Sequence, residues 1–229
     1  MEPPPDPHHL NALDAPNAPD AFDGSPTWKV VRQLRDGTPI TIRLISPDDR
    51  EDLRQAFLET SPTTRYLRFL GVVSELTDHM LTYLTEVDQK NHVALVATIV
   101  SPDLKTERGV GIARLIRLHE DPHAAEAAIT VADSMQRRGV GTALALELER
   151  AARFVGIHVI RAEVYEGNQA MRAILEGAGA KRVESRTGSG TISYDIAIES
   201  PHLPSARITD VLRGAATTMA VSLRKLMPP

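Results

Sequence analysis

Three apolar runs that follow one another closely constrain this 229-residue chain more than any other feature. They cover residues 93–100, 110–118 and 126–132, and only short polar segments separate them. Nearly continuous apolar runs of this length are typical of strands that are buried on both faces of a sheet. The sequence therefore predicts three successive central strands.

Further elements are predicted on both sides of these strands. An Asp-Gly pair within residues 35–38 indicates a hairpin turn, and the alternation over residues 40–44 indicates a half-buried strand. Capping residues predict helix starts at Ser46, Ser61 and Thr77. The later part predicts helices and strands in the order 141–155, 159–165, 168–178, 181–187 and 191–198. This order favours an α/β fold with a mixed sheet of about seven strands and helices on its faces.

The two ends of the chain differ from this central part. Residues 1–27 are rich in proline and polar residues, which predicts a disordered tail. We expect one domain over residues 28–200. Residues 201–229 carry apolar side chains at helical spacing, and we expect this amphipathic helical tail to dock on the domain or on a second copy, which would make a homo-oligomer.

Composition argues against several classes of protein. The net charge is −4 and no long basic run occurs, which disfavours nucleic-acid binding. The absence of cysteine excludes disulfides, thiolate zinc sites and a cysteine nucleophile. The sequence has neither a signal-peptide pattern nor an apolar run of about 18 residues, so we expect no membrane span and a cytoplasmic location. His119, Asp121 and His123 are expected to form a solvated turn, and no metal site is predicted.

The segment between the strand ending near residue 132 and the next helix reads Gln-Arg-Arg-Gly-Val-Gly-Thr, residues 136–142. Glycines let a backbone approach a ligand closely, and the free N–H groups at a helix start bind phosphates. This combination predicts a pyrophosphate-binding loop. The order of residues fits neither the dinucleotide-binding glycine pattern nor the P-loop, which ends in Gly-Lys-Ser/Thr.

The loop and the order of elements resemble the GNAT superfamily of N-acetyltransferases over about residues 35–200. The resemblance implies a mostly antiparallel sheet and acetyl-CoA as co-substrate. It also implies that the cofactor is bound by Val131, Asn168 and the loop residues Gln136, Arg137, Arg138, Gly139, Val140, Gly141 and Thr142. Asn168 could equally serve only as a helix N-cap.

Glu126 is the candidate general base, because a carboxylate can accept the proton of an attacking ammonium group. It resembles the strand glutamate that has this role in several GNAT enzymes. The alternative is a charge at the exposed edge of the strand. The family's usual acid, a tyrosine, is replaced by Leu175, and Tyr165 is a substitute candidate that could equally be a core or surface residue.

Two further segments, residues 34–38 and 65–69, resemble bacterial protein-lysine acetyltransferases of the Pat type. The predicted function is therefore acetyl transfer from acetyl-CoA to an amine, with protein lysine as one candidate acceptor. The alternatives are a small-molecule amine acetyltransferase and a non-catalytic acyl-CoA-binding sensor or interaction module.

Overall fold

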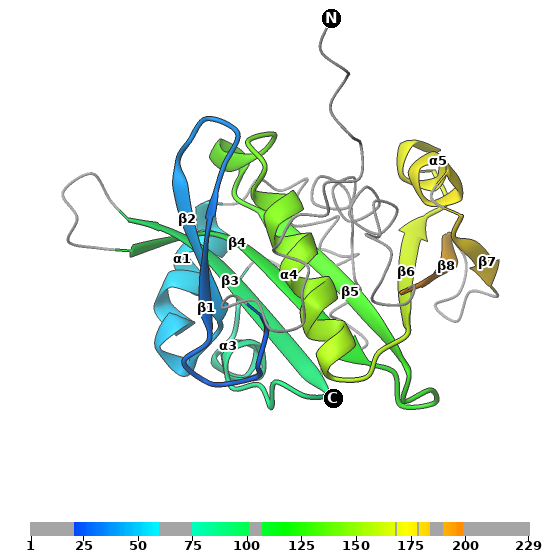
Figure 1. The fold of residues 1–229 in the computed structure, drawn as a ribbon, viewed down its shortest axis with the longest axis horizontal. Coiled ribbons are helices and arrows are strands. Elements are labelled where there is room, and N and C mark those ends of the chain that lie inside the picture. Colours follow the sequence, from blue (N-terminus) through cyan, green and yellow to red (C-terminus); the bar gives the residue numbers. More distant parts are fainter. Residues whose placement is uncertain are drawn as a thin grey trace, which may run out of the picture.

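The computed structural model describes residues 21–59, 75–100, 107–167, 169–177, 179–183 and 190–198. Within these ranges the chain forms an eight-stranded sheet in the order β1-β2-β3-β4-β5-β6-β8-β7 (Figure 1). All neighbouring strands are antiparallel except β5 and β6, which are parallel. The strands are β1 (Lys29–Gln33), β2 (Pro39–Leu44), β3 (His92–Val100), β4 (Glu107–Arg117), β5 (Ala124–Val131), β6 (Val159–Tyr165), β7 (Lys181–Val183) and β8 (Thr191–Ala197).

Helix α4 (Val140–Phe154) crosses one face of the sheet, as Figure 1 shows. Its apolar stripe includes Leu144 and Leu148, which are fully buried. They belong to the same core as alternate residues of β5, such as Ala127 and Ile129. A methyl group added at Gly111 of β4 would come within 2.9 Å of the Leu144 side chain, so this glycine permits close helix–sheet packing. Helix α5 (Gln169–Gly177) contributes Leu175 to this core.

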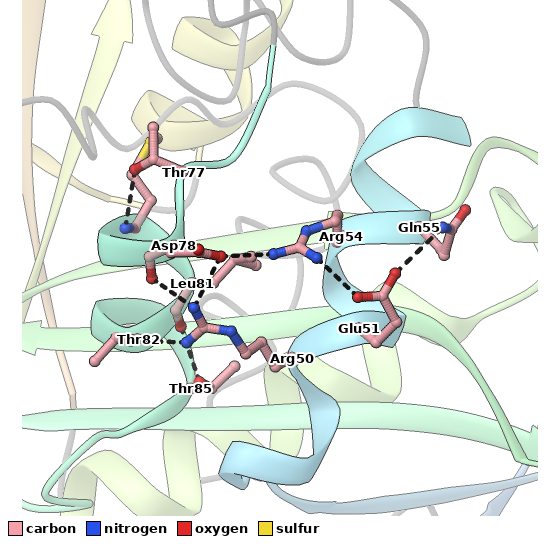
Figure 2. Close-up of polar contacts among 10 residues, drawn as sticks. Arg50, Glu51, Arg54, Gln55, Thr77, Asp78, Leu81, Thr82 and Thr85 are labelled. Carbon is pink, nitrogen blue, oxygen red and sulfur yellow. Dashed lines mark hydrogen bonds and ion pairs between the residues drawn. The ribbon is translucent and has the colours of Figure 1, made fainter.

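The opposite face of the sheet carries α1 (Arg50–Glu59), which follows the short helix η2 (Pro47–Asp49), and α3 (Asp78–Thr85). These two helices share a smaller apolar cluster around Phe57, Leu81 and Leu84. Polar contacts join them as well (Figure 2): Arg50 donates to the Thr82 hydroxyl at 2.7 Å, and Arg54 donates to the Asp78 carboxylate at 2.8 Å.

The structure confirms the predicted α/β class, the mixed sheet and most of its strands. The eighth strand is β1, the first arm of the predicted hairpin, whose turn contains Gly37 at φ +80°. The expected helix that starts at Ser61, the part of the strand 181–187 beyond Val183 and the C-terminal helical tail lie outside the described residues, as do residues 1–20.

The packed chain begins earlier than expected. Phe22, which the sequence analysis assigned to a disordered tail, is only 6% exposed. Its ring lies 4.8 Å from the ring of Trp28 and 5.4 Å from that of Phe154. The tail prediction is therefore wrong for this segment, because an aromatic residue finds an apolar surface at the end of α4. Among the described helices, none is long and apolar enough to cross a membrane.

Candidate active site

The parallel strands β5 and β6 are paired over only three residues. The pairs are Ala124 with Val159, Ala125 with Ile160, and Glu126 with Arg161. Beyond Glu126 the two strands diverge toward their carboxyl ends (Figure 1). Among the described residues, β5 and β6 do not pair beyond this point, so the main-chain groups of residues 127–131 on this side of β5 have no β6 partner where the sheet opens. An extended ligand could hydrogen-bond to these groups.

The predicted pyrophosphate loop lies at the end of β5, between the short helix η3 (Asp133–Met135) and α4. Gly139 is the N-cap of α4 and has φ +108°, a conformation that favours glycine. Gly139 has no side chain, so the N-cap residue itself makes no side-chain hydrogen bond to the first turn. The first turn of any α-helix leaves N–H groups without an intrahelical acceptor, so the start of α4 can bind an anion.

The side chains of the loop have different surroundings. Gln136 donates to the Asp133 carboxylate at 2.9 Å. Arg137 has φ +61°, is exposed and makes no ion pair within the described part of the chain. Arg138 instead pairs with Asp36 of the β1–β2 turn, at 2.5 Å. The two adjacent arginines therefore differ: Arg137 is available to a ligand, and Arg138 already has a carboxylate partner.

The other predicted cofactor residues can contribute mainly through their backbone. Val131 and Val140 are buried in the core, with 3% and 0% of their surface exposed. Gly141 is buried and Thr142 is half-buried, both in the first turn of α4. Asn168 lies outside the described residues.

Glu126 is the third residue of β5, which has β4 and β6 as neighbours on either side. It is half-buried, and β5 is not an edge strand of the sheet. Its side chain points to the face opposite α4, since its neighbours Ala125 and Ala127 belong to the α4 core. Glu126 is also the last residue of β5 that is paired with β6, so it stands where the opening begins.

Arg161 is the residue opposite Glu126 on β6, and Asp195 is opposite Arg161 on β8. Arg161 donates two hydrogen bonds to the Asp195 carboxylate, at 2.7 and 2.8 Å. The pKa of the Arg161 guanidinium is raised above its ordinary value. The hydrogen bonds to Asp195 are the largest cause, and the negative charge of Glu126 adds to the effect. The carboxylate of Glu126 therefore lies in the field of a cation that a second carboxylate holds in place.

Tyr83 of α3 lies near Glu126 and Arg114 on the same face of the sheet. Burial raises the pKa of the Tyr83 hydroxyl; the charge of Glu126 adds to this effect and that of Arg114 opposes it. The Tyr83 ring lies 5.2 Å from the His92 ring, and the Nε2 atom of His92 lies 3.2 Å from the buried guanidinium of Arg114. Tyr83 keeps its proton at neutral pH and can donate a hydrogen bond.

Sequence reasoning did not identify Tyr83, His92, Arg114 or Arg161 as neighbours of Glu126. A signal existed for Arg114 and Arg161, since each is a charged residue with an apolar residue on either side within a strand, as Glu126 is. Leu175 is fully buried, as its predicted place in the apolar stripe of the helix requires. The side chain of Tyr165 lies outside the described part.

This fold and loop define the class of protein. A family model described as "Acetyltransferase (GNAT) domain" matches residues 40–181. The chain belongs to the GNAT acetyltransferase family and is an acyltransferase, and acetyl-CoA is the co-substrate of this family.

Three relatives illustrate the similarity. Acetyltransferase PA5475 of Pseudomonas aeruginosa is 35% identical over 149 residues, which cover 65% of this chain and 78% of that protein. Acetyltransferase Pat of Mycolicibacterium smegmatis is 33% identical over 166 residues, which cover 72% of this chain but only 48% of that longer protein. The crystal structure of the GNAT domain of S. lividans PAT aligns with a TM-score of 0.64 and 27% identity, covering 74% of this chain and 97% of that domain.

Proposed function

We propose that this chain is an N-acetyltransferase that transfers acetyl from acetyl-CoA to an amine, with Glu126 as the general base. The observation that carries the proposal is the position of Glu126. Its carboxylate is half-buried inside the sheet, at the residue where β5 and β6 begin to diverge. A thioester held in this opening would lie beside the carboxylate, and the pyrophosphate would lie at the start of α4.

The reaction needs few protein groups. Glu126 accepts a proton from the substrate ammonium, and the neutral amine then attacks the thioester carbonyl. A carbon–nitrogen bond forms and the carbon–sulfur bond breaks, with the electron pair leaving on the thiolate of CoA, while the proton that the attacking nitrogen loses passes to this thiolate through solvent. A thiol pKa of about 8.5 makes this leaving group acceptable without a dedicated acid. Tyr83 is a candidate hydrogen-bond donor on the same face of the sheet.

We further propose the side-chain amine of a protein lysine as the acceptor. Support comes from the resemblance of residues 34–38 and 65–69 to Pat-type enzymes and from the matches to two Pat proteins. A screen of acetyl-CoA consumption with proteins and small amines tests this choice. Acetylation of small amines alone would favour a small-molecule amine as the natural acceptor.

The general base is tested with Glu126→Gln, which keeps the shape of the side chain and removes its basicity. We expect turnover to fall by about 10²- to 10⁴-fold, the usual size of a general-base effect, with unchanged affinity for CoA. The deficit should shrink at high pH, where more of the amine is already neutral. The measurement is a pH–rate profile with the best acceptor, together with CoA binding by calorimetry.

Three results would count against this assignment. Turnover within a few-fold of the parent at neutral pH would place the base elsewhere. Loss of CoA binding in Glu126→Gln would give the residue a structural role. A parent chain that binds acetyl-CoA but acetylates no acceptor would favour a non-catalytic sensor.

A further inference from the structure

The turn between β1 and β2 lies against the loop that precedes α4, although their contact joins residues 102 positions apart in sequence (Figure 1). The Asp36 carboxylate uses its two oxygens differently. Oδ1 accepts the backbone N–H of Thr38 at 3.0 Å, which holds the turn. Oδ2 accepts from Nε and Nη2 of Arg138 at 3.0 and 2.5 Å, which joins the turn to the loop.

These contacts occupy every nitrogen of the Arg138 guanidinium. Nη2 also donates to the Thr38 hydroxyl at 3.2 Å, and Nη1 donates to the sulfur of Met135 at 2.9 Å. The backbone of Arg138 is held too, since its carbonyl accepts the N–H of Arg35 at 3.4 Å. Gly139, the N-cap of α4, has a left-handed backbone conformation and follows Arg138 directly. The contact therefore fixes the backbone just before the helix N–H groups that would bind pyrophosphate.

The Asp36–Arg138 contact adds little to the stability of the fold. Its effect is therefore on the conformation of the loop that it holds. The two side chains are 38% and 45% exposed, and ion pairs at such sites contribute little to the free energy of folding. The pKa of Asp36 is lowered to about 2, and the hydrogen bond from Arg138 is the largest cause. The carboxylate therefore stays charged throughout the physiological pH range.

We propose that Asp36 is a positioning residue for the acyl-CoA loop: it anchors Arg138, so that Arg138 orders the loop and does not itself bind the pyrophosphate. This inference rests on the proposed function, because it assumes that the loop binds acetyl-CoA. It assigns different roles to the two neighbouring arginines and leaves Arg137 as the side chain that faces a ligand.

The test compares CoA binding by calorimetry in Asp36→Asn, Arg138→Gln and the double variant. Asparagine can still accept the Thr38 N–H, so the turn is kept and only the charged contact is lost. We expect each single variant to bind CoA about threefold to tenfold more weakly, with no additional loss in the double variant, since all three break one contact. Asp78→Asn is the matched control. It removes an exposed aspartate that pairs with Arg50 and Arg54 on the other face of the sheet, and it should bind CoA normally (Figure 2).

Steady-state kinetics separate positioning from a general loss of structure. The variants should raise the KM for acetyl-CoA and leave kcat unchanged. With S-acetylpantetheine, which lacks the pyrophosphate, their kcat/KM should equal that of the parent. Equal losses with both donors, together with a lower melting temperature, would mean a structural role and would overturn the proposal.

Other outcomes also overturn it. Unchanged or tighter CoA binding by Asp36→Asn would show that Asp36 does not order the loop. A much larger loss in Arg138→Gln than in Asp36→Asn would make Arg138 a pyrophosphate ligand. A parent chain that fails to bind CoA would overturn this inference together with the proposed function. A parent that binds CoA without transferring acetyl would remove the proposed reaction alone.

Discussion

At the scale of single residues, Asp88 fixes the turn that leads from α3 into β3. Its Oδ1 atom accepts the backbone N–H groups of Lys90, Asn91 and His92 at 2.9, 2.8 and 2.9 Å. Burial opposes ionisation of this carboxyl, but the three hydrogen bonds outweigh it and lower its pKa to about 2. The turn thereby places His92, whose ring contacts Tyr83 beside the candidate active site.

Asp88→Ala should therefore destabilise the fold by about 1–2 kcal/mol at neutral pH, as the loss of a capping carboxylate usually does. The pKa of Asp88 in the folded state lies below the ordinary aspartate value of 3.8, so the carboxylate stabilises the fold above that pH and loses this effect as the pH falls toward about 2. Denaturant unfolding of parent and variant at pH 6 and pH 3 measures the difference, which should be smaller at pH 3. An equal difference at both pH values would show that another interaction is responsible.

The residues around Glu126 show which part of the site the sequence could predict. Glu126 itself was recognisable because its strand is otherwise apolar. The positions of its neighbours could not be predicted, because Arg161 opposes Glu126 only through the parallel β5–β6 pairing, and Asp195 opposes Arg161 only through β6–β8. Such registers depend on which strands become neighbours in space, and local patterns do not determine this.

At the scale of elements, α3 carries Tyr83 and begins at a conventional N-cap. Thr77 has an extended backbone, and its hydroxyl accepts the N–H of Met80 at 3.2 Å (Figure 2). The sequence predicted this start correctly because capping depends on neighbouring residues alone. The contacts of α3 with α1 through Arg50 and Arg54 were not predictable in this way, since they join residues that are 28 and 24 positions apart in the sequence.

Thr77→Ala should cost about 1 kcal/mol of stability, because the first turn of α3 loses its cap. Thr77→Ser, which keeps the hydroxyl, is the control and should stay close to the parent. Thermal unfolding of the three proteins gives the comparison. If the serine variant loses as much as the alanine variant, the methyl group of Thr77 and not its hydroxyl stabilises the helix.

At the scale of the whole molecule, the domain includes residues before Trp28. Phe22 packs between Trp28 and Phe154, and the Trp28 indole N–H donates to the carbonyl of Ala21 at 3.1 Å. This segment connects the start of β1 to the end of α4. Sequence patterns missed it because a single aromatic residue among prolines has no periodicity.

Phe22→Ala should lower the free energy of unfolding by about 2–4 kcal/mol, slightly less than for aromatic residues in central cores. A chain that begins at residue 21 should melt like the full chain, and one that begins at residue 28 should melt like Phe22→Ala or lower. Melting temperatures of these proteins provide the measurement. Equal stability of all of them would mean that the segment does not contribute to the fold.

The order of strands in the sheet also has a consequence for how the chain folds. Strands β1 to β5 pair in the order in which they occur in the sequence. The β1–β2, β3–β4 and β4–β5 pairings close short loops, whereas the β2–β3 pairing closes residues 45–91, which include η2, α1 and α3. The β5–β6 pairing must wait for α4 to cross the sheet, and β6 pairs with β8, not with the next strand. Because closing short loops costs less entropy, we expect the meander of β3, β4 and β5 to assemble first. The half of the sheet formed by β6, β7 and β8 would then be added to this folding nucleus through three residue pairs.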